Sequence, residues 1–182
     1  MNVRIFGLAL VVFLASYTVP GRTDLLGTPE LELHSPSFRP YGMIPAKYTC
    51  DGEDISPELW WAWVPRDTKS FVLMCEDVDS PRASRVNWVY YDLPAAVMYL
   101  PERVARVTRP ALGGVHGKNG TGELGYRGPC QQTGTHRYYF RLYALDVMLG
   151  LEPGASWRDV ERAMEGHVLD EASLMGMYKK RK

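Results

Sequence analysis

The sequence is poor in cysteine and has no cysteine pair of the metal-binding or redox type. Its three cysteines, Cys50, Cys75 and Cys130, stand far apart, and no C-x-x-C spacing occurs. A structural zinc site or a thioredoxin-type centre is therefore disfavoured. Cys75 lies in an apolar strand pattern and is expected to be a buried thiol. Cys50 and Cys130 lie in loops beside polar motifs, so they are the candidates for a disulfide.

The chain also has no excess of either charge. Lys plus Arg and Asp plus Glu number 21 each among 182 residues, so there is no overall basic field to hold a phosphate backbone. This balance disfavours a nucleic-acid partner. The basic end, 179–182, is expected to be a solvated terminus. With 46% hydrophobic residues and no repeat or low-complexity tract, the chain suits one globular domain.

Long apolar runs are scarce, and the most notable one lies near the N-terminus. Arg4 precedes eleven apolar or glycine residues, 5–15, and Pro20-Gly21 follows. This run is too short to span a bilayer comfortably, but it is typical of a signal peptide. We therefore expect a signal peptide over 1–21, a linker over 22–29, one domain over 30–182, and export to the periplasm or exterior. A clear small-x-small cleavage site is missing, which leaves an uncleaved N-terminal anchor as the alternative.

Strand patterns dominate the rest of the chain. The segment 70–76 is apolar on both faces and predicts a central strand, 86–93 predicts another, and shorter strands are expected near 31–33 and 59–63. Ser156 predicts the N-cap of a helix over 157–165, and 167–174 predicts a second short helix. This order predicts a mostly β, antiparallel domain with short C-terminal helices.

Polar residues gather where loops meet these strands. Gly125, Gly128, Pro129 and Gly134 mark a tight loop before a strand over 136–145, in which His136 and Tyr138 share one face. Asp77 and Asp79 follow the strand over 70–76. A ligand site is one interpretation; a hydrogen-bonded core histidine and turn-capping aspartates are the other.

A second acidic segment follows Cys50. The loop 51–57 carries three carboxylates, but its spacing differs from that of an EF-hand and it has no distal glutamate. We therefore favour a structural turn in which Asp and Ser side chains accept backbone N–H groups.

These motifs together resemble the phosphatidylethanolamine-binding protein family, in particular its bacterial Raf kinase inhibitor-like branch. The matching pieces, spread over 31–178, are Ile44-Pro45, 48–52, Ser56-Pro57, 77–81, Trp88, Leu93-Pro94, 125–130, 136–138, 143–146 and Gly166-His167. The resemblance implies a Greek-key antiparallel β fold with an anion pocket at one end of the central sheet. Carried over by position, the ligand-binding residues are Asp77, Asp79, Pro81, Asn87, Gly128, Pro129, His136, Tyr138 and Tyr178.

Two positions depart from the family pattern. Asn87 stands where a histidine is usual, and Gln131-Gln132 replaces the two prolines that usually follow the cysteine. Asparagine can donate a hydrogen bond but cannot become cationic at mildly acid pH.

Three classes of function follow. The leading one is a binding protein for a small phosphate-bearing ligand or phospholipid head group, with no cofactor and no metal. The second is a protein-interaction regulator of the kinase- or protease-inhibitor type, acting through a protein partner. The third is a hydrolase using Asp77 or Asp79 with His136, although the sequence has no recognised nucleophile elbow. The two aspartates and the histidine also suit a metal triad, but the resemblance favours an anion instead.

Overall fold

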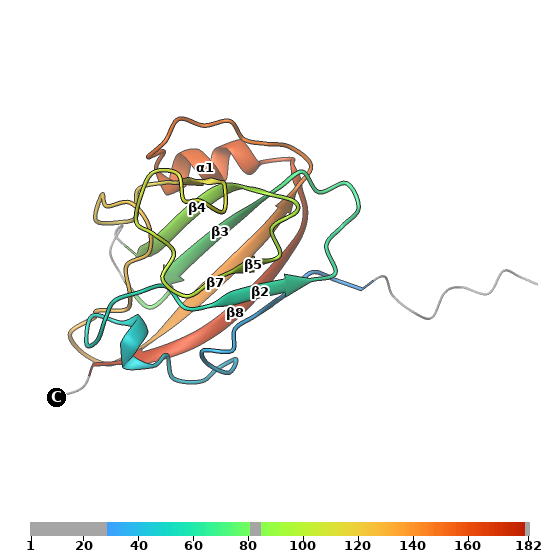
Figure 1. Cartoon of the computed structure of the whole chain (residues 1–182). Coiled ribbons are helices and arrows are strands. Elements are labelled where there is room, and N and C mark those ends of the chain that lie inside the picture. The colour runs from blue at the N-terminus through green and yellow to red at the C-terminus, as the bar shows by residue number, and fades with distance from the viewer. Residues whose placement is uncertain (1–28, 81–84, 181–182) are drawn as a thin grey trace, which may run out of the picture.

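Two antiparallel β-sheets form the framework of the computed structural model, which describes residues 29–80 and 85–180 (Figure 1). The larger sheet has the order β6-β4-β3-β7-β8, and the smaller has the order β1-β2-β5. The larger sheet consists of β3 (Ser70–Asp77), β4 (Val86–Pro94), β6 (Val115–His116), β7 (Thr135–Leu145) and β8 (Val168–Lys179). The smaller sheet consists of β1 (Glu32–His34), β2 (Leu59–Ala62) and β5 (Tyr99–Leu100).

Four strands of the larger sheet form a Greek key. In chain order they are β3, β4, β6 and β7, and the last of them returns to lie beside the first. Their three pairings are all antiparallel. This spatial order is the one that defines the motif, so the predicted fold class is confirmed.

Strand β3 is the centre of the molecule, as its sequence predicts. All of its residues are buried. Its odd-numbered side chains face the core between the two sheets, and Val72 and Met74 belong to a second core on the opposite face. The continuous apolar run therefore reflects burial on both faces.

Strand β7 divides its two faces as its alternating pattern predicts. Tyr138, Phe140, Leu142 and Ala144 are buried in the inner core, whereas the intervening residues from Arg137 to Tyr143 are exposed or half-buried. Because β7 lies between β3 and β8, its inner face is fixed by hydrogen bonds on both edges.

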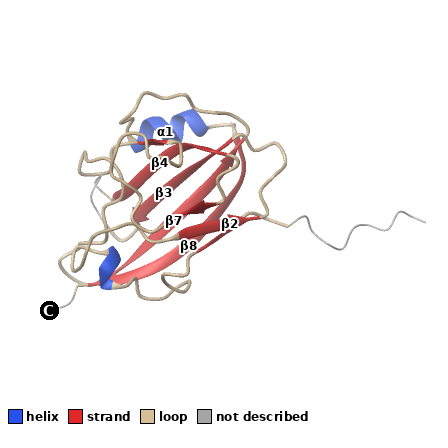
Figure 2. Cartoon of the chain, viewed as in Figure 1, coloured by secondary structure: helices blue, strands red, loops and turns tan. Residues whose placement is uncertain are grey.

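One α-helix, α1 (Trp157–Met164), covers the second core (Figure 2). The side chain of Ser156 accepts from the Asp159 N–H, and the Asp159 carboxylate accepts from the Ser156 N–H, which forms a capping box. Val160 and Met164 are buried against the sheet. A short 3₁₀ helix, η1 (Ala46–Tyr48), precedes the disulfide loop.

The predicted second helix over 167–174 is wrong. Residues 168–179 form β8, which pairs with β7 from Thr135↔Lys179 to Leu145↔Val168. Leu174, Gly176 and Tyr178 are buried at every second position, the period of a strand. Helix-forming residues such as Glu171 and Leu174 obscured this period, and pairing along the whole length of β7 overrides their local preference.

Several predictions lie wholly or mainly outside the described residues: the signal peptide over 1–21, the linker over 22–29, and Pro81. Within the described part of the chain, no helix is long and apolar enough to cross a membrane.

Candidate ligand-binding site

Strand register brings the predicted site residues to one end of the larger sheet. Asp77, the last residue of β3, lies opposite Tyr138 on β7. His136 lies opposite Tyr178 on β8. Residues directly opposite in antiparallel strands project to the same face, so these four side chains meet at the edge of the inner core. Tyr178 lies on β8, the strand that replaces the helix predicted over 167–174.

The carboxylate of Asp77 organises this group. Its Oδ2 and Oδ1 atoms lie 2.8 and 3.0 Å from the His136 Nδ1, and the Tyr138 hydroxyl lies 2.9 Å from Oδ2. The backbone N–H of Asp79 donates to Oδ1 at 3.1 Å. Asp77 and Tyr138 are almost fully buried, but the His136 side chain keeps 20% of its surface exposed. His136 is therefore the member of this network that solvent can reach.

Two tyrosine hydroxyls in the site remain protonated. Burial raises the pKa of Tyr138 far above its ordinary value, and the nearby Asp77 carboxylate raises it further. Burial also raises the pKa of Tyr178 to about 12, with a smaller contribution from a hydrogen bond to Asp51. Both hydroxyls are thus hydrogen donors at neutral pH.

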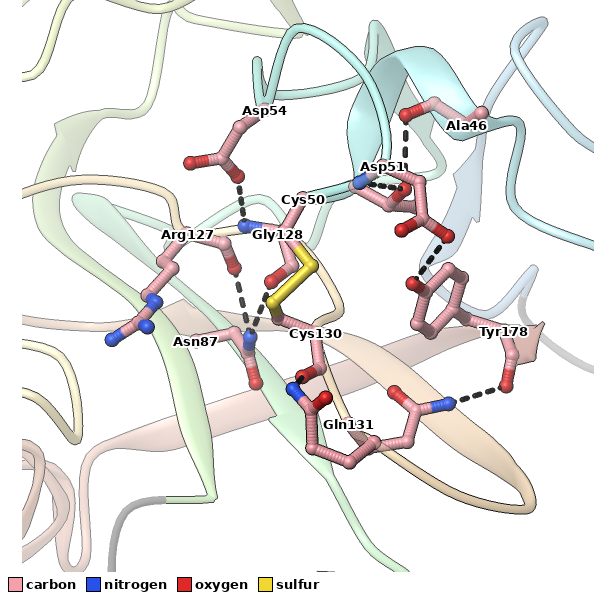
Figure 3. Close-up of a disulfide and its surroundings, with 12 residues drawn as sticks. Ala46, Cys50, Asp51, Asp54, Asn87, Arg127, Gly128, Cys130, Gln131 and Tyr178 are labelled. Atoms are coloured by element: carbon pink, nitrogen blue, oxygen red, sulfur yellow. Dashed lines mark hydrogen bonds between the residues drawn. A yellow bond between two sulfur atoms is a disulfide. The ribbon is translucent and has the colours of Figure 1, made fainter. Parts of the chain in front are cut away.

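A disulfide and hydrogen bonds hold the glycine-rich loop before β7 against the segment that follows η1 (Figure 3). Cys50 and Cys130, the candidate pair, are joined by a disulfide, and the Cys50 N–H donates to the Pro129 carbonyl at 3.1 Å. The Gly128 N–H donates to the Asp54 carboxylate at 2.6 Å. A Cβ at Gly128 would lie only 2.4 Å from the carbonyl oxygen of Tyr48, so this close approach requires glycine.

Asn87 supports the same loop. Its side-chain amide donates to the carbonyl of Arg127 at 2.8 Å and lies 3.4 Å from that of Gly128 (Figure 3). The amide hydrogens are thus directed at the backbone of the loop. Asn87 positions Gly128 and Pro129, and its predicted role in holding a ligand stays a prediction.

Asp79 is bound by Arg137. Its carboxylate accepts from the backbone N–H and the guanidinium of Arg137, at distances down to 2.6 Å. Those hydrogen bonds lower the pKa of Asp79 to about 2. Arg137 therefore balances the negative charge of Asp79, and the Asp79 carboxylate is not part of the hydrogen-bond network around Asp77.

Three residues beyond the predicted set complete the site. Gln131 lies between Tyr138 and β8, with Oε1 2.7 Å from the Tyr138 hydroxyl and Nε2 donating to the Tyr178 carbonyl at 2.7 Å. Asp51 accepts from the Tyr178 hydroxyl at 2.6 Å, and Asp54 holds Gly128 (Figure 3). The departure from the usual prolines marked Gln131 in the sequence. The acidic loop marked the two aspartates as turn residues, but no local signal showed what they would contact.

This arrangement suits binding through hydrogen bonds. Among residues 29–80 and 85–180, no three histidine, cysteine or carboxylate side chains are grouped as metal ligands. Cys75 is fully buried, and burial raises the pKa of its thiol well above the ordinary value, so it is no accessible nucleophile.

Two surface grooves lie outside the group around Asp77, although Asp54 lines the first of them. One, of about 240 Å³, is lined by 53–56 and 103–106, and the other by 66–69, Asp146 and Leu169. Neither is lined by Asp77, His136 or Tyr138.

The chain also matches a known protein family. Residues 34–179 match the sequence profile of the family described as phosphatidylethanolamine-binding protein. The chain belongs to this family. Family membership places it among ligand-binding or regulatory proteins in general terms, without naming a ligand or partner.

Relatives occur in archaea and bacteria. A UPF0098 protein of Methanothermobacter thermautotrophicus is 51% identical over 82% of this chain and 99% of its own length. A UPF0098 protein of Aquifex aeolicus is 46% identical, covering 82% and 89% of the two chains.

Solved structures extend the likeness to the fold. The putative phosphatidylethanolamine-binding protein homolog CT736 of Chlamydia trachomatis is 41% identical with a TM-score of 0.75, covering 84% of this chain and 99% of its own. E. coli YbcL, titled a new member of the mammalian family, is 27% identical with a TM-score of 0.77, covering 84% of this chain and all of its own.

Proposed function

We propose that this protein reversibly binds small phosphate-bearing molecules, such as free phosphate esters or phospholipid head groups, at the site around His136. The observation that carries the proposal is the Asp77–His136–Tyr138 group at the end of the inner core, beside the clamped glycine loop. Family membership supports the same class of function.

The geometry suggests how an anion is held next to a buried carboxylate. Asp77 already accepts three hydrogen bonds, from His136, Tyr138 and the Asp79 backbone. With Nδ1 directed at Asp77, the second ring nitrogen of His136 is left for the ligand. A protonated His136 then donates a charge-assisted hydrogen bond to a phosphate oxygen.

Binding without turnover is part of this proposal. Hydrolysis needs an activated nucleophile, and Asp79, one of the two candidate carboxylates, is engaged by Arg137. Asp77 is almost fully buried and serves the hydrogen bonds described above.

We also infer that the protein is exported. The N-terminal pattern of Arg4 followed by an apolar run supports this, and so does the disulfide between Cys50 and Cys130, because such bonds persist in oxidising compartments.

The function is tested by calorimetric titration with phosphoethanolamine, inorganic phosphate and ethanolamine. The two phosphate-bearing compounds should bind the wild type and ethanolamine should not. His136→Gln should weaken phosphoethanolamine binding about tenfold or more, the amount expected from losing a charge-assisted hydrogen bond. His34→Gln, which alters a histidine on β1 in the other sheet, is the matched control.

Equal binding by wild type and His136→Gln would place the ligand elsewhere, and absence of binding would refute the proposal. Release of ethanolamine from phosphoethanolamine by the wild type, lost in Asp77→Asn, would favour the hydrolase alternative.

A further inference from the structure

Gln131, in the loop between Cys130 and Gly134, has a side chain that hydrogen-bonds to both neighbouring strands of the site, β7 and β8. Its Nε2 donates to the Tyr178 carbonyl at the end of β8, a contact that only the amide nitrogen can make. This fixes the orientation of the carboxamide. Its oxygen must therefore face the Tyr138 hydroxyl, 2.7 Å away.

The Tyr138 hydroxyl consequently lies between two acceptors. Asp77 Oδ2 is 2.9 Å from it and Gln131 Oε1 is 2.7 Å from it. A phenol has one hydrogen to donate, so the two oxygens compete for it. Tyr138 is 1% exposed, so water cannot readily supply the missing hydrogen.

Because the hydroxyl is buried, a phosphate oxygen bound beside His136 could receive the same hydrogen only by displacing one of these two acceptors. We propose that Gln131 is a specificity-determining residue that competes with the ligand for the Tyr138 hydroxyl and so weakens the binding of phosphate-bearing ligands. This inference rests on the proposed function. It assigns to Gln131 a role opposite to that of Asn87 and Asp54, which hold the loop and support the site.

Competition and simple support predict opposite signs. If Gln131 only positions the loop, shortening or replacing it loosens the site and weakens binding. If it competes, removing its oxygen frees the hydroxyl and tightens binding. Gln131→Met separates the two, because methionine keeps the length and much of the packing of glutamine but removes the competing oxygen.

The experiment is calorimetric titration with phosphoethanolamine at neutral pH. Gln131→Met and Gln131→Ala should bind about fivefold to tenfold more tightly than wild type, the range that one net hydrogen bond supplies. The matched control is Gln132→Ala, since Gln132 is exposed and its amide bonds only to the Cys130 carbonyl of its own loop.

A double-mutant cycle ties the effect to the hydroxyl. In a Tyr138→Phe background the hydrogen in question is gone, so Gln131→Met should no longer tighten binding. A tightening that persists there would overturn the inference, as would weaker or unchanged binding in Gln131→Met while the wild type binds.

The outcomes separate this inference from the proposed function. Binding by the wild type with no gain in Gln131→Met refutes the competition alone. Binding by Gln131→Met but not by the wild type supports the competition but refutes the proposed function of the natural chain, and binding by neither refutes both.

Discussion

His116 lies in the interior as a neutral imidazole that the site does not use. Its Nδ1 contacts the Val107 carbonyl at 2.8 Å, and its Nε2 accepts from the Trp88 indole at 3.1 Å. Nδ1 therefore carries the hydrogen, because a carbonyl can only accept. Burial lowers the pKa of His116 from 6.5 to about 4, and the hydrogen bond to Val107 only partly opposes this.

This histidine should make the fold sensitive to mild acid. Between about pH 6.5 and about pH 4, His116 binds a proton in the unfolded chain but stays neutral in the folded protein. The free energy of unfolding should therefore fall as the pH drops through this range. The loss attributable to this group is on the order of 3 kcal/mol across that range. Urea unfolding at pH 7, 6 and 5 measures it.

His116→Gln should flatten this pH dependence, whatever its effect on stability at pH 7. His34→Gln is the control, because the His34 side chain is 38% exposed. An unchanged slope in His116→Gln would show that other groups govern acid unfolding.

Gly128 shows how one residue can be determined by its surroundings rather than by its own backbone angles. The carbonyl of Tyr48, the Asp54 carboxylate and the Cα of Thr49 all lie within 2.8 Å of where a Cβ would be. The glycine pattern marked this position as special in the sequence, and only the packed loop shows the reason.

Strand β8 and helix α1 illustrate opposite outcomes of local prediction. The helix was predicted from a cap residue and an ending glycine, signals that lie within the segment itself. The strand was missed because its decisive partner, β7, ends more than twenty residues earlier in the chain. Its short period-two pattern was not distinctive without that partner.

The capping box at α1 gives a prediction for this element. Ser156→Ala removes the side-chain acceptor of the Asp159 N–H and should lower the free energy of unfolding by about 1 kcal/mol. Chemical denaturation measures it. Thr133→Ala, in an exposed loop, is the control, and equal stability of both variants would mean that the cap contributes nothing.

The Cys50–Cys130 disulfide links distant parts of the whole molecule. Its cysteines are 80 residues apart, and the bond fastens the segment after η1 to the loop before β7. Closing so large a loop restricts the unfolded chain, so the bond is expected to stabilise the fold even though other hydrogen bonds join the same segments.

Protein recovered from outside the cytoplasm should therefore carry this bond, as non-reducing peptide mapping can show. Reduction should lower its free energy of unfolding by about 2 to 4 kcal/mol. The double variant Cys50→Ser/Cys130→Ser is the control and should not respond to reductant. Two free thiols in exported protein would contradict both the pairing and its link to export.

The sequence by itself determined three strands of the larger sheet, β3, β4 and β7, and the face of β7 that is turned inward. The apolar runs of β3 and β4 indicate burial on both faces, and the alternation along β7, with a period of two, distinguishes its inner from its outer face. Asp77 ends one of these strands and His136 lies at the start of another. The sequence, together with the family resemblance, could therefore predict that the two side chains lie close together at one edge of the sheet.

Only the tertiary structure decided what each polar group contacts. Asp79 turns to Arg137, Asn87 and Asp54 hold the loop, and Gln131 reaches between β7 and β8. These bonds join residues that are mostly 40 to 74 positions apart, and their partners are set by strand register and by the disulfide clamp. The residue type determines which hydrogen bonds a side chain can donate or accept, whereas the packing of the folded chain determines which of them form.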